Sequence, residues 1–288
     1  MQKGSWLQSN CRRMRQYYRP LLTVFSVVLT LGLASSCKSQ YELLLSSNDN
    51  DLKYEKAFEY FNNEKYRRAA ELFESLSQVS GGTDRDDTIK FYWGYSNYLY
   101  GDYVTAEANL KYFTDIYPLS PFTEYAKYLR IICLYKATYR YELDQVPTYQ
   151  AMDAIGRFLI ENPGSEHADE CYAMLDDLNA RLDKKAFEAA RLYYIMEDYK
   201  ASRTAFRNIL KEDAETIFRE DILYYTAMSS YEYALNSVRE KQRERYLTFI
   251  DDYYNFVSEY PDSDYRKQLD NCYSKVQRYL GRHGGTKE

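Results

Sequence analysis

Apolar residues recur at spacings of three and four positions from Asp51 to Leu280, with polar residues between them. This spacing is typical of amphipathic helices, whose side chains return to the same face about every 3.6 residues. A half-buried strand would instead alternate apolar and polar residues, and no stretch of useful length does so. The pattern predicts an all-α body over residues 51–280.

The helical pattern repeats along the chain. In three segments a small residue is followed, at offsets of 9, 12, 16 and 19, by a tyrosine, another small residue and two large apolar residues. Small residues let two antiparallel helices approach closely, and large residues fill the groove between them. This arrangement resembles the tetratricopeptide (TPR) repeat. The copies are Ala57, Tyr66, Ala69, Phe73 and Leu76; Gly94, Tyr103, Ala106, Leu110 and Phe113; and Ala190, Tyr199, Ser202, Phe206 and Ile209.

A second pattern marks the ends of repeats. Proline stands two residues before serine in YPLS (117–120), NPGS (162–165) and YPDS (260–263). Proline cannot continue a helix, and each serine can N-cap the helix that follows. Counting back from these prolines gives two weaker copies, with Ala151, Ile155 and Phe158 and with Phe249, Tyr253 and Phe256.

These two patterns together predict a TPR-like solenoid. It consists of about five antiparallel helix pairs, and a last helix at 263–280 acts as a cap. The predicted pairs fall at about 51–80, 84–117, 121–162, 165–213 and 216–260.

Residues 138–150 interrupt the third predicted pair, and Pro147 breaks any continuation of the helix before it. Loops tolerate insertions, so the preferred interpretation is an extended helix end and a loop. The alternative is a loop that contacts a partner protein.

The N-terminus has the organisation of a secretory signal. Residues 12–19 are basic, and residues 21–33 form an apolar run of 13 residues. A transmembrane helix needs about 20 apolar residues, so this run is too short to span comfortably. We predict a signal peptide over residues 1–36, with either Met1 or Met14 as the true start. A flexible tail is expected at residues 281–288.

The small residues that end this signal are followed directly by Cys37. This resembles the bacterial lipobox, in which the cysteine receives a diacylglyceryl group and becomes the first residue after cleavage. Leu33 lies one place earlier than in the commonest pattern. The alternative is an ordinary cleaved signal with an incidental cysteine. The resemblance implies a lipid anchor at Cys37, followed by a tether over residues 37–50.

The residues after Cys37 indicate the membrane in which the protein is anchored. Lys38, Ser39 and Gln40 lack the acidic cluster that resembles the export signal of surface lipoproteins, and Lys38 differs from the aspartate that retains lipoproteins in the inner membrane. The expected place is therefore the periplasmic face of the outer membrane.

Charge argues against nucleic acid as a partner. The formal net charge of the 288 residues is −5, but residues 1–36 carry five basic residues and no acid, so the rest carries −10. A body of that sign repels phosphates.

Candidate catalytic chemistry is sparse. His167 and His283 do not form a ligand set, and the cysteines of the predicted body have no CxxC spacing. Buried small hydrophobes are the preferred interpretation of Cys133, Cys171 and Cys272, over a disulfide or a reactive thiol. No phosphate loop or nucleophile motif occurs. We predict no enzyme activity, no metal and no cofactor.

Tyrosine is over-represented, at 34 of 288 residues. The first helices of the first two repeats carry aromatic residues at matching positions, and stacked TPR pairs present such helices to peptides. A groove for an extended, aromatic-rich peptide is one interpretation, and packing between helices is the other. The candidate peptide-binding residues are Tyr54, Phe58, Phe61, Phe91, Tyr95 and Tyr98.

The lipobox, the tether, the five TPR-like pairs and the Pro-x-Ser repeat ends together resemble the BamD family of outer-membrane lipoproteins of the β-barrel assembly machinery. YEKAFEYFNNEKYRRAAELFE (54–74) and KKAFEAARLYYIMEDYKAS (184–202) look like its Bacteroides-type version. The resemblance implies a non-enzymatic scaffold. The repeats near residues 190–280 would dock on the barrel subunit BamA, and the N-terminal repeats would receive the C-terminal signals of unfolded outer-membrane proteins, which typically end in an aromatic residue.

Two other classes remain open. Another periplasmic TPR lipoprotein could serve as a scaffold for cell-envelope or division proteins. A glycan-uptake lipoprotein built on TPR helices resembles much longer chains with large inserted loops.

Overall fold

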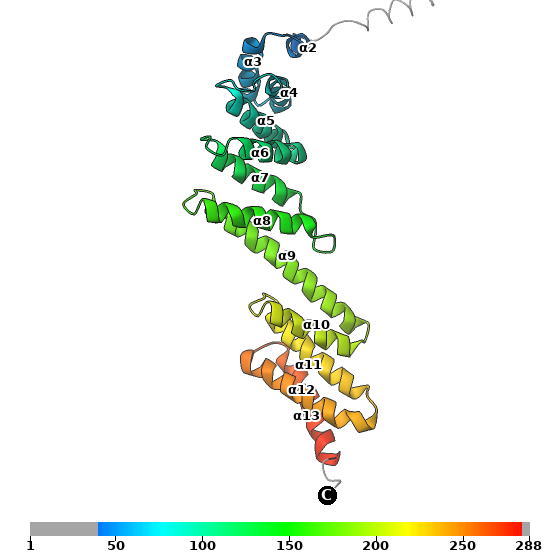
Figure 1. Cartoon of the computed structure of the whole chain (residues 1–288). Coiled ribbons are helices and arrows are strands. Elements are labelled where there is room, and N and C mark those ends of the chain that lie inside the picture. The colour runs from blue at the N-terminus through cyan, green and yellow to red at the C-terminus, as the bar shows by residue number, and fades with distance from the viewer. Residues whose placement is uncertain (1–39, 284–288) are drawn as a thin grey trace, which may run out of the picture. The chain divides into compact units, whose positions relative to one another are not determined.

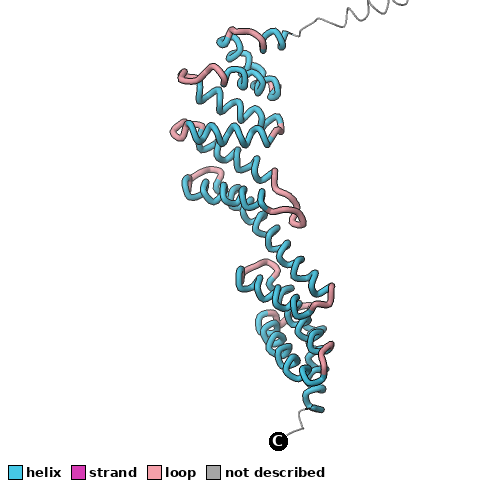
Figure 2. Tube along the Cα trace, turned by 45° about the vertical axis from the view of Figure 1, so that its right-hand side comes forward, coloured by secondary structure: helices cyan, strands magenta, loops and turns pink. Residues whose placement is uncertain are grey.

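The computed structural model describes residues 40–283. The predicted signal peptide over 1–36 and the predicted lipidation site Cys37 lie outside the described residues. Within them the chain forms twelve helices and no strand (Figures 1 and 2). They are α2 (Gln40–Leu45), α3 (Asn50–Asn62), α4 (Tyr66–Ser77), α5 (Asp86–Tyr100), α6 (Tyr103–Ile116), α7 (Thr123–Lys136), α8 (Val146–Glu161), α9 (Ala168–Ile195), α10 (Tyr199–Glu212), α11 (Arg219–Leu235), α12 (Arg239–Glu259) and α13 (Arg266–His283).

The prediction of an all-α, TPR-like fold is confirmed. Helices α3 and α4, α7 and α8, α9 and α10, and α11 and α12 pack as consecutive pairs. Three residues join the helices of each pair, except that residues 137–145 connect α7 to α8. No helix within residues 40–283 is long and apolar enough to cross a membrane.

The repeat positions form the core of these pairs. The side chains of Ala57, Ala69 and Phe73 are fully buried, as are those of Ala106, Leu110 and Phe113 in the second copy. In the third copy, Ala190, Ser202 and Phe206 are buried, whereas Ile209 is half-buried. Small residues at these positions allow close helix approach, as the spacing predicts.

The chain divides into two compact units, Met1–Ser96 and Asn97–Glu288. The described part of the first contains α2, α3, α4 and most of α5. Its core joins Ala57 of α3 to Leu72, Phe73 and Leu76 of α4 and to Ile89 of α5.

Helix α2 lies inside the segment predicted as a tether, so that part of the prediction needs correction. The ring of Tyr41 packs edge-on against Tyr60, with ring centroids 5.5 Å apart. Its hydroxyl donates a hydrogen bond to Glu71 at 2.5 Å. These contacts attach residues 40–45 to α3 and α4, a docking that local periodicity over six residues cannot reveal.

Three cores follow one another from α7 to α13. The first lies among α7, α8 and α9, the second among α9, α10 and α11, and the third among α11, α12 and α13. The 28-residue helix α9 contributes Cys171 and Leu178 to the first core and Phe187 and Ala190 to the second. The long helix therefore couples two neighbouring repeats.

The serines of the Pro-x-Ser motifs do not N-cap the helices directly. Helices α7, α9 and α13 begin three residues after Ser120, Ser165 and Ser263. Each serine hydroxyl instead accepts a hydrogen bond from the backbone N–H two residues later, at 3.4, 3.3 and 3.1 Å. The serine thus closes a turn that leads into the helix, because its side chain satisfies the nearest free N–H group.

The inserted segment 138–150 is a loop up to Gln145, and Pro147 lies in the first turn of α8, where proline is tolerated. The amide of Gln145 donates to the carbonyls of Arg140 and Leu143 at 2.9 and 3.0 Å. Lys185 of α9 donates to the Tyr141 carbonyl at 2.9 Å. The loop is therefore held by the neighbouring helix.

Candidate peptide-binding site

Four of the predicted peptide-binding residues lie in one aromatic cluster of the first unit. Phe58 and Phe61 of α3 both contact Tyr92 of α5, with ring centroids 4.7 and 5.0 Å apart. Phe61 also contacts Tyr95 at 5.4 Å, and Tyr54 contacts Phe58 at 5.0 Å. All five rings are half-buried. The cluster therefore packs between helices and also presents aromatic surface to the solvent.

Tyr92 was missed by the sequence analysis although it is the central ring of this cluster. Its position, three residues before Tyr95, places both side chains on one helix face, and this spacing is the signal that could have found it. Burial raises the pKa of the Tyr92 hydroxyl. It therefore stays protonated and can donate a hydrogen bond at neutral pH.

Phe91 does not belong to the exposed surface. Its side chain is 3% exposed, and its ring packs against Tyr92 and Tyr95 at 5.3 and 5.6 Å. The inclusion of Phe91 among peptide-binding residues is corrected on this ground, because a side chain that the protein already covers cannot contact a ligand. Tyr98 lies on α5 beyond the unit boundary and packs on Tyr103 at 5.9 Å.

A pocket of about 310 Å³ opens beside Tyr54. Leu76, Val79 and Ile89 supply apolar wall, and Arg85 lies at its edge. The Arg85 guanidinium lies over the Tyr54 ring, 4.7 Å from the centroid. It also donates to Asp51 at 2.8 Å, in an ion pair whose side chains are 53% and 85% exposed.

The loop that carries Arg85 is fastened by a buried polar network. Asp86 accepts hydrogen bonds from Ser80, at 2.5 Å, and from Lys90. Gly82 of the same loop has a φ of 79°, which glycine adopts without steric cost. The network positions Val79 and Arg85 on the wall of the pocket. Sequence spacing gives no signal for either residue, because the loop has no periodicity.

The arrangement can hold a chain end that combines an apolar side chain with a carboxylate. The apolar wall favours burial of the side chain, and the guanidinium provides a bidentate donor for the carboxylate. Exposed ion pairs such as Arg85 with Asp51 contribute little, about 0–1 kcal/mol. Exchange of Asp51 for a ligand carboxylate therefore costs little.

The three cysteines among the described residues are free and buried, as the preferred interpretation holds. Burial raises the pKa of the Cys133 thiol to about 12 and that of Cys171 to about 11. Such thiols stay protonated and unreactive at neutral pH. Across residues 40–283, no group of three or more His, Cys, Asp or Glu side chains is placed to hold a metal ion.

The model of the family YfiO, described as outer membrane lipoprotein, matches residues 47–246. A relative from Caulobacter vibrioides, named outer membrane protein assembly factor BamD, is 21% identical over 208 residues, which cover 72% of this chain and 68% of that protein. A relative of the same name from Rickettsia prowazekii is 22% identical over 218 residues, covering 73% and 84%.

A thermophilic TPR protein from Thermus thermophilus is 12% identical, with a TM-score of 0.30, and the match covers 77% of this chain and 98% of that one.

Proposed function

Because the chain belongs to the YfiO family of outer membrane lipoproteins, we propose that it is a non-enzymatic scaffold in outer-membrane protein assembly. Family membership confirms the resemblance drawn from the sequence. The observation that carries the proposal is that both relatives bear the name outer membrane protein assembly factor. In this proposal, lipid on Cys37 holds the chain at the periplasmic face of the outer membrane.

The first unit receives the C-terminal signals of unfolded outer-membrane proteins. The last residue of the client places an aromatic side chain against the exposed Val79 and the half-buried ring of Tyr54, and its terminal carboxylate pairs with Arg85. What supports this assignment is the pocket beside Tyr54, which joins apolar wall to a guanidinium. Upstream residues of the client contact the half-buried rings of the cluster, which continue from Tyr54 through Phe58.

The repeats near residues 190–280 dock on a BamA-like barrel protein. Support comes from large apolar side chains that are exposed at the end of α9 and at the start of α12. Ile195 and Met196 are 61% and 66% exposed, and Val238 is 67% exposed. Exposed apolar side chains that gather at element ends are suited to a protein partner.

A peptide-binding measurement tests the client site. We expect Arg85→Ala to weaken binding of a fluorescent ten-residue peptide ending in Phe-COOH by about tenfold, because a charge-assisted hydrogen bond is lost. The same peptide with an amidated C-terminus should bind wild type and variant alike. Arg67→Ala, which removes another exposed arginine of the first unit, is the matched control and should leave affinity within about twofold. Equal affinity of the Arg85 variant for the free acid contradicts the proposed site.

A pull-down tests the assembly role itself. The tagged, lipidated protein is extracted from its own outer membrane in mild detergent, and its partners are identified by mass spectrometry. We expect a large barrel protein with periplasmic repeat domains, recovered near one to one. Recovery of cell-wall or division proteins without such a barrel would favour the alternative scaffold role.

A further inference from the structure

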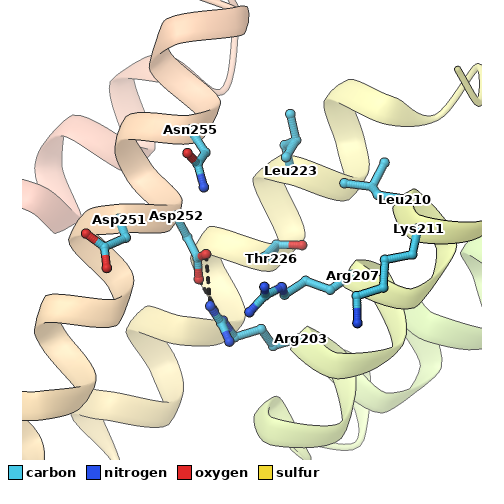
Figure 3. A pocket seen from close by; sticks show the side chains of 9 residues that line it. All are labelled: Arg203, Arg207, Leu210, Lys211, Leu223, Thr226, Asp251, Asp252 and Asn255. Atoms are coloured by element: carbon cyan, nitrogen blue, oxygen red, sulfur yellow. Dashed lines mark hydrogen bonds and ion pairs between the residues drawn. The ribbon is translucent and has the colours of Figure 1, made fainter. Parts of the chain in front are cut away.

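A groove in the second unit has charged walls that are separate from the exposed apolar residues Ile195, Met196 and Val238. It is a pocket of about 390 Å³ among α10, α11 and α12. Arg203, Arg207 and Lys211 line it from α10, at positions four residues apart, which places them on one helix face. Leu210 and Leu223 provide apolar surface, and Asp251 and Asn255 lie across the groove on α12 (Figure 3).

The guanidinium of Arg203 already has an ion-pair partner within the protein. Its guanidinium makes a bidentate pair with Asp252, at 2.7 and 3.0 Å, drawn as dashed lines in Figure 3. The Asp252 side chain is 7% exposed and also accepts a hydrogen bond from Ser230. Arg203 therefore serves to join α10 to α12.

Arg207 and Lys211 differ from Arg203 in this respect. Both side chains are exposed, and neither has an ion-pair partner among residues 40–283. In Figure 3 the Arg207 side chain reaches from α10 toward α11 and α12, into the same pocket as Arg203. Like charges four residues apart on a helix repel each other by a few tenths of a kcal/mol. The face therefore carries uncompensated positive charge beside apolar surface.

The chain contains a second groove that acts as an internal comparison. Residues 96 positions earlier correspond in the repeat, as Tyr103 does to Tyr199. Four of the corresponding residues line a pocket among α6, α7 and α8, namely Thr114, Asp115, Lys127 and Arg130. There, Lys111 pairs with Asp115 at 2.9 Å, Arg130 with Glu107 at 2.7 Å and Lys127 with Glu161 at 2.6 Å.

The two grooves differ in charge at several corresponding positions. Lys211 stands where Asp115 would supply a counter-charge, Arg203 stands where Glu107 does, and Leu223 and Thr226 stand where Lys127 and Arg130 do. The earlier groove pairs Lys111, Lys127 and Arg130 with acids, whereas Arg207 and Lys211 of the later groove have no ion-pair partner among residues 40–283.

We propose that the groove among α10, α11 and α12 binds an acidic segment of a partner polypeptide, with carboxylates on Arg207 and Lys211 and an apolar side chain on Leu210 and Leu223. A lone phosphate group is disfavoured because Asp251 faces the same space. A peptide suits the groove better, since its amide N–H groups can meet Asp251 while its acidic side chains meet α10. The groove lies within the repeats near residues 190–280, so the inference rests on the proposed docking of these repeats and adds the chemistry of the segment that they hold. It does not depend on the client site, which lies wholly in the first unit.

The test uses the full chain in a non-ionic detergent and fluorescence anisotropy of a labelled peptide of four Glu-Glu-Leu repeats. We expect the double variant Arg207→Glu, Lys211→Glu to bind at least about tenfold more weakly, and wild-type affinity to fall as salt is raised. Both positions are exposed, so the variant should keep its helical circular dichroism. Lys111→Glu with Lys127→Glu in the earlier groove is the matched control and should change affinity less than about twofold.

Three outcomes would overturn the inference. One is equal affinity of wild type and the double variant. Another is equal binding of a Gln-Gln-Leu repeat peptide, which shows that affinity does not depend on the charge of the peptide. The third is no peptide binding while phosphatidylglycerol vesicles bind wild type but not the variant, which assigns the face to lipid. Arg85→Ala should leave acidic-peptide binding unchanged, so failure here and failure of the client site are separable.

Discussion

Tyrosine side chains join neighbouring helices throughout the described part of this protein. Several hydroxyls donate to carboxylates on a neighbouring helix or turn, as Tyr253 does to Asp270 and Tyr265 to Asp221, both at 2.6 Å. Tyr128 donates to Glu170 and stacks on His167 with ring centroids 3.8 Å apart. A tyrosine can fill apolar space between helices and still satisfy its hydroxyl. Abundance alone therefore does not identify a peptide groove.

An aromatic residue also recurs two positions after the Ser or Thr that closes each inter-repeat turn of the second unit, except that His167 takes this place once. Phe218 stacks on Phe187 of α9 at 4.9 Å, and Tyr265 stacks on Tyr224 of α11 at 4.1 Å. These rings pack the entry of one repeat against the first helix of the repeat before it. The sequence contains this aromatic position, but the Pro-x-Ser pattern does not include it.

At this scale the buried pair of Arg203 and Asp252 gives a sharp prediction. Asp252→Asn should lower the free energy of unfolding of the second unit by about 2 kcal/mol, because Arg203 and Ser230 lose a charged acceptor. The cost stays below that of a fully buried pair since the Arg203 side chain is 23% exposed. Urea denaturation followed by circular dichroism measures it. Asp251→Asn is the adjacent control and should shift stability by no more than about 0.5 kcal/mol.

At the scale of the element, the turns inside three helix pairs share one backbone feature. The residue two positions before the repeat tyrosine has a positive φ, namely 59° at Glu64, 92° at Gly101 and 62° at Glu197. Asp102 and Asp198 then cap α6 and α10 by accepting from the N–H of Thr105 and Ala201, at 3.1 and 3.0 Å. The same local geometry is built from different residues, because the turn requires a conformation and not a particular side chain.

Gly101→Ala should therefore lower stability by about 1 kcal/mol. A Cβ at this position meets no atom within 4 Å, so the cost is backbone strain alone. Gly156→Ala, inside α8, is the matched substitution with the opposite expectation. It also meets nothing within 4 Å and should raise stability by about 0.5–1 kcal/mol. Urea midpoints that shift in the same direction for both variants would contradict this account.

At the scale of the whole molecule, stability is distributed over neighbouring cores and not concentrated in one. In the second unit the cores share α9 and α11, so each pair is supported only by the pair next to it, as in other repeat proteins. These cores also contain many half-buried or buried tyrosine rings. Burial raises the pKa of Tyr224 and of Tyr231 to about 12, and burial with a hydrogen bond to Asp270 raises that of Tyr253 to about 12.

The loss of folding stability at alkaline pH follows from these raised tyrosine pKa values. An unfolded tyrosine ionises near pH 10. Because the folded pKa is higher, the unfolded state releases its protons first, and the stabilisation is complete below pH 10 and lost as the pH rises toward 12. We expect the urea midpoint to fall between about pH 10 and pH 12. Absorbance near 295 nm should show tyrosine ionisation together with loss of helix. Full ionisation near pH 10 with intact circular dichroism would contradict this.

Periodicity was sufficient to predict the helix pairs and the buried repeat positions Ala57, Phe73 and Phe206, because a helix and its apolar face are determined by residues a few positions apart. The grouping of the candidate aromatic residues was predicted only in part. Tyr54, Phe58, Phe61 and Tyr95 reach a half-buried cluster, whereas Phe91 is covered and Tyr92 was missed.

Tertiary contacts decide the docking of α2 and the position of Arg85 at the pocket. They also decide which cations of α10 are paired. Each contact joins residues about 30 to 50 positions apart, such as Tyr41 with Glu71, Arg85 with Asp51 and Arg203 with Asp252. The neighbouring helices decide whether a side chain is covered, paired or free. The spacing of residues along one helix does not show which neighbours fold against it.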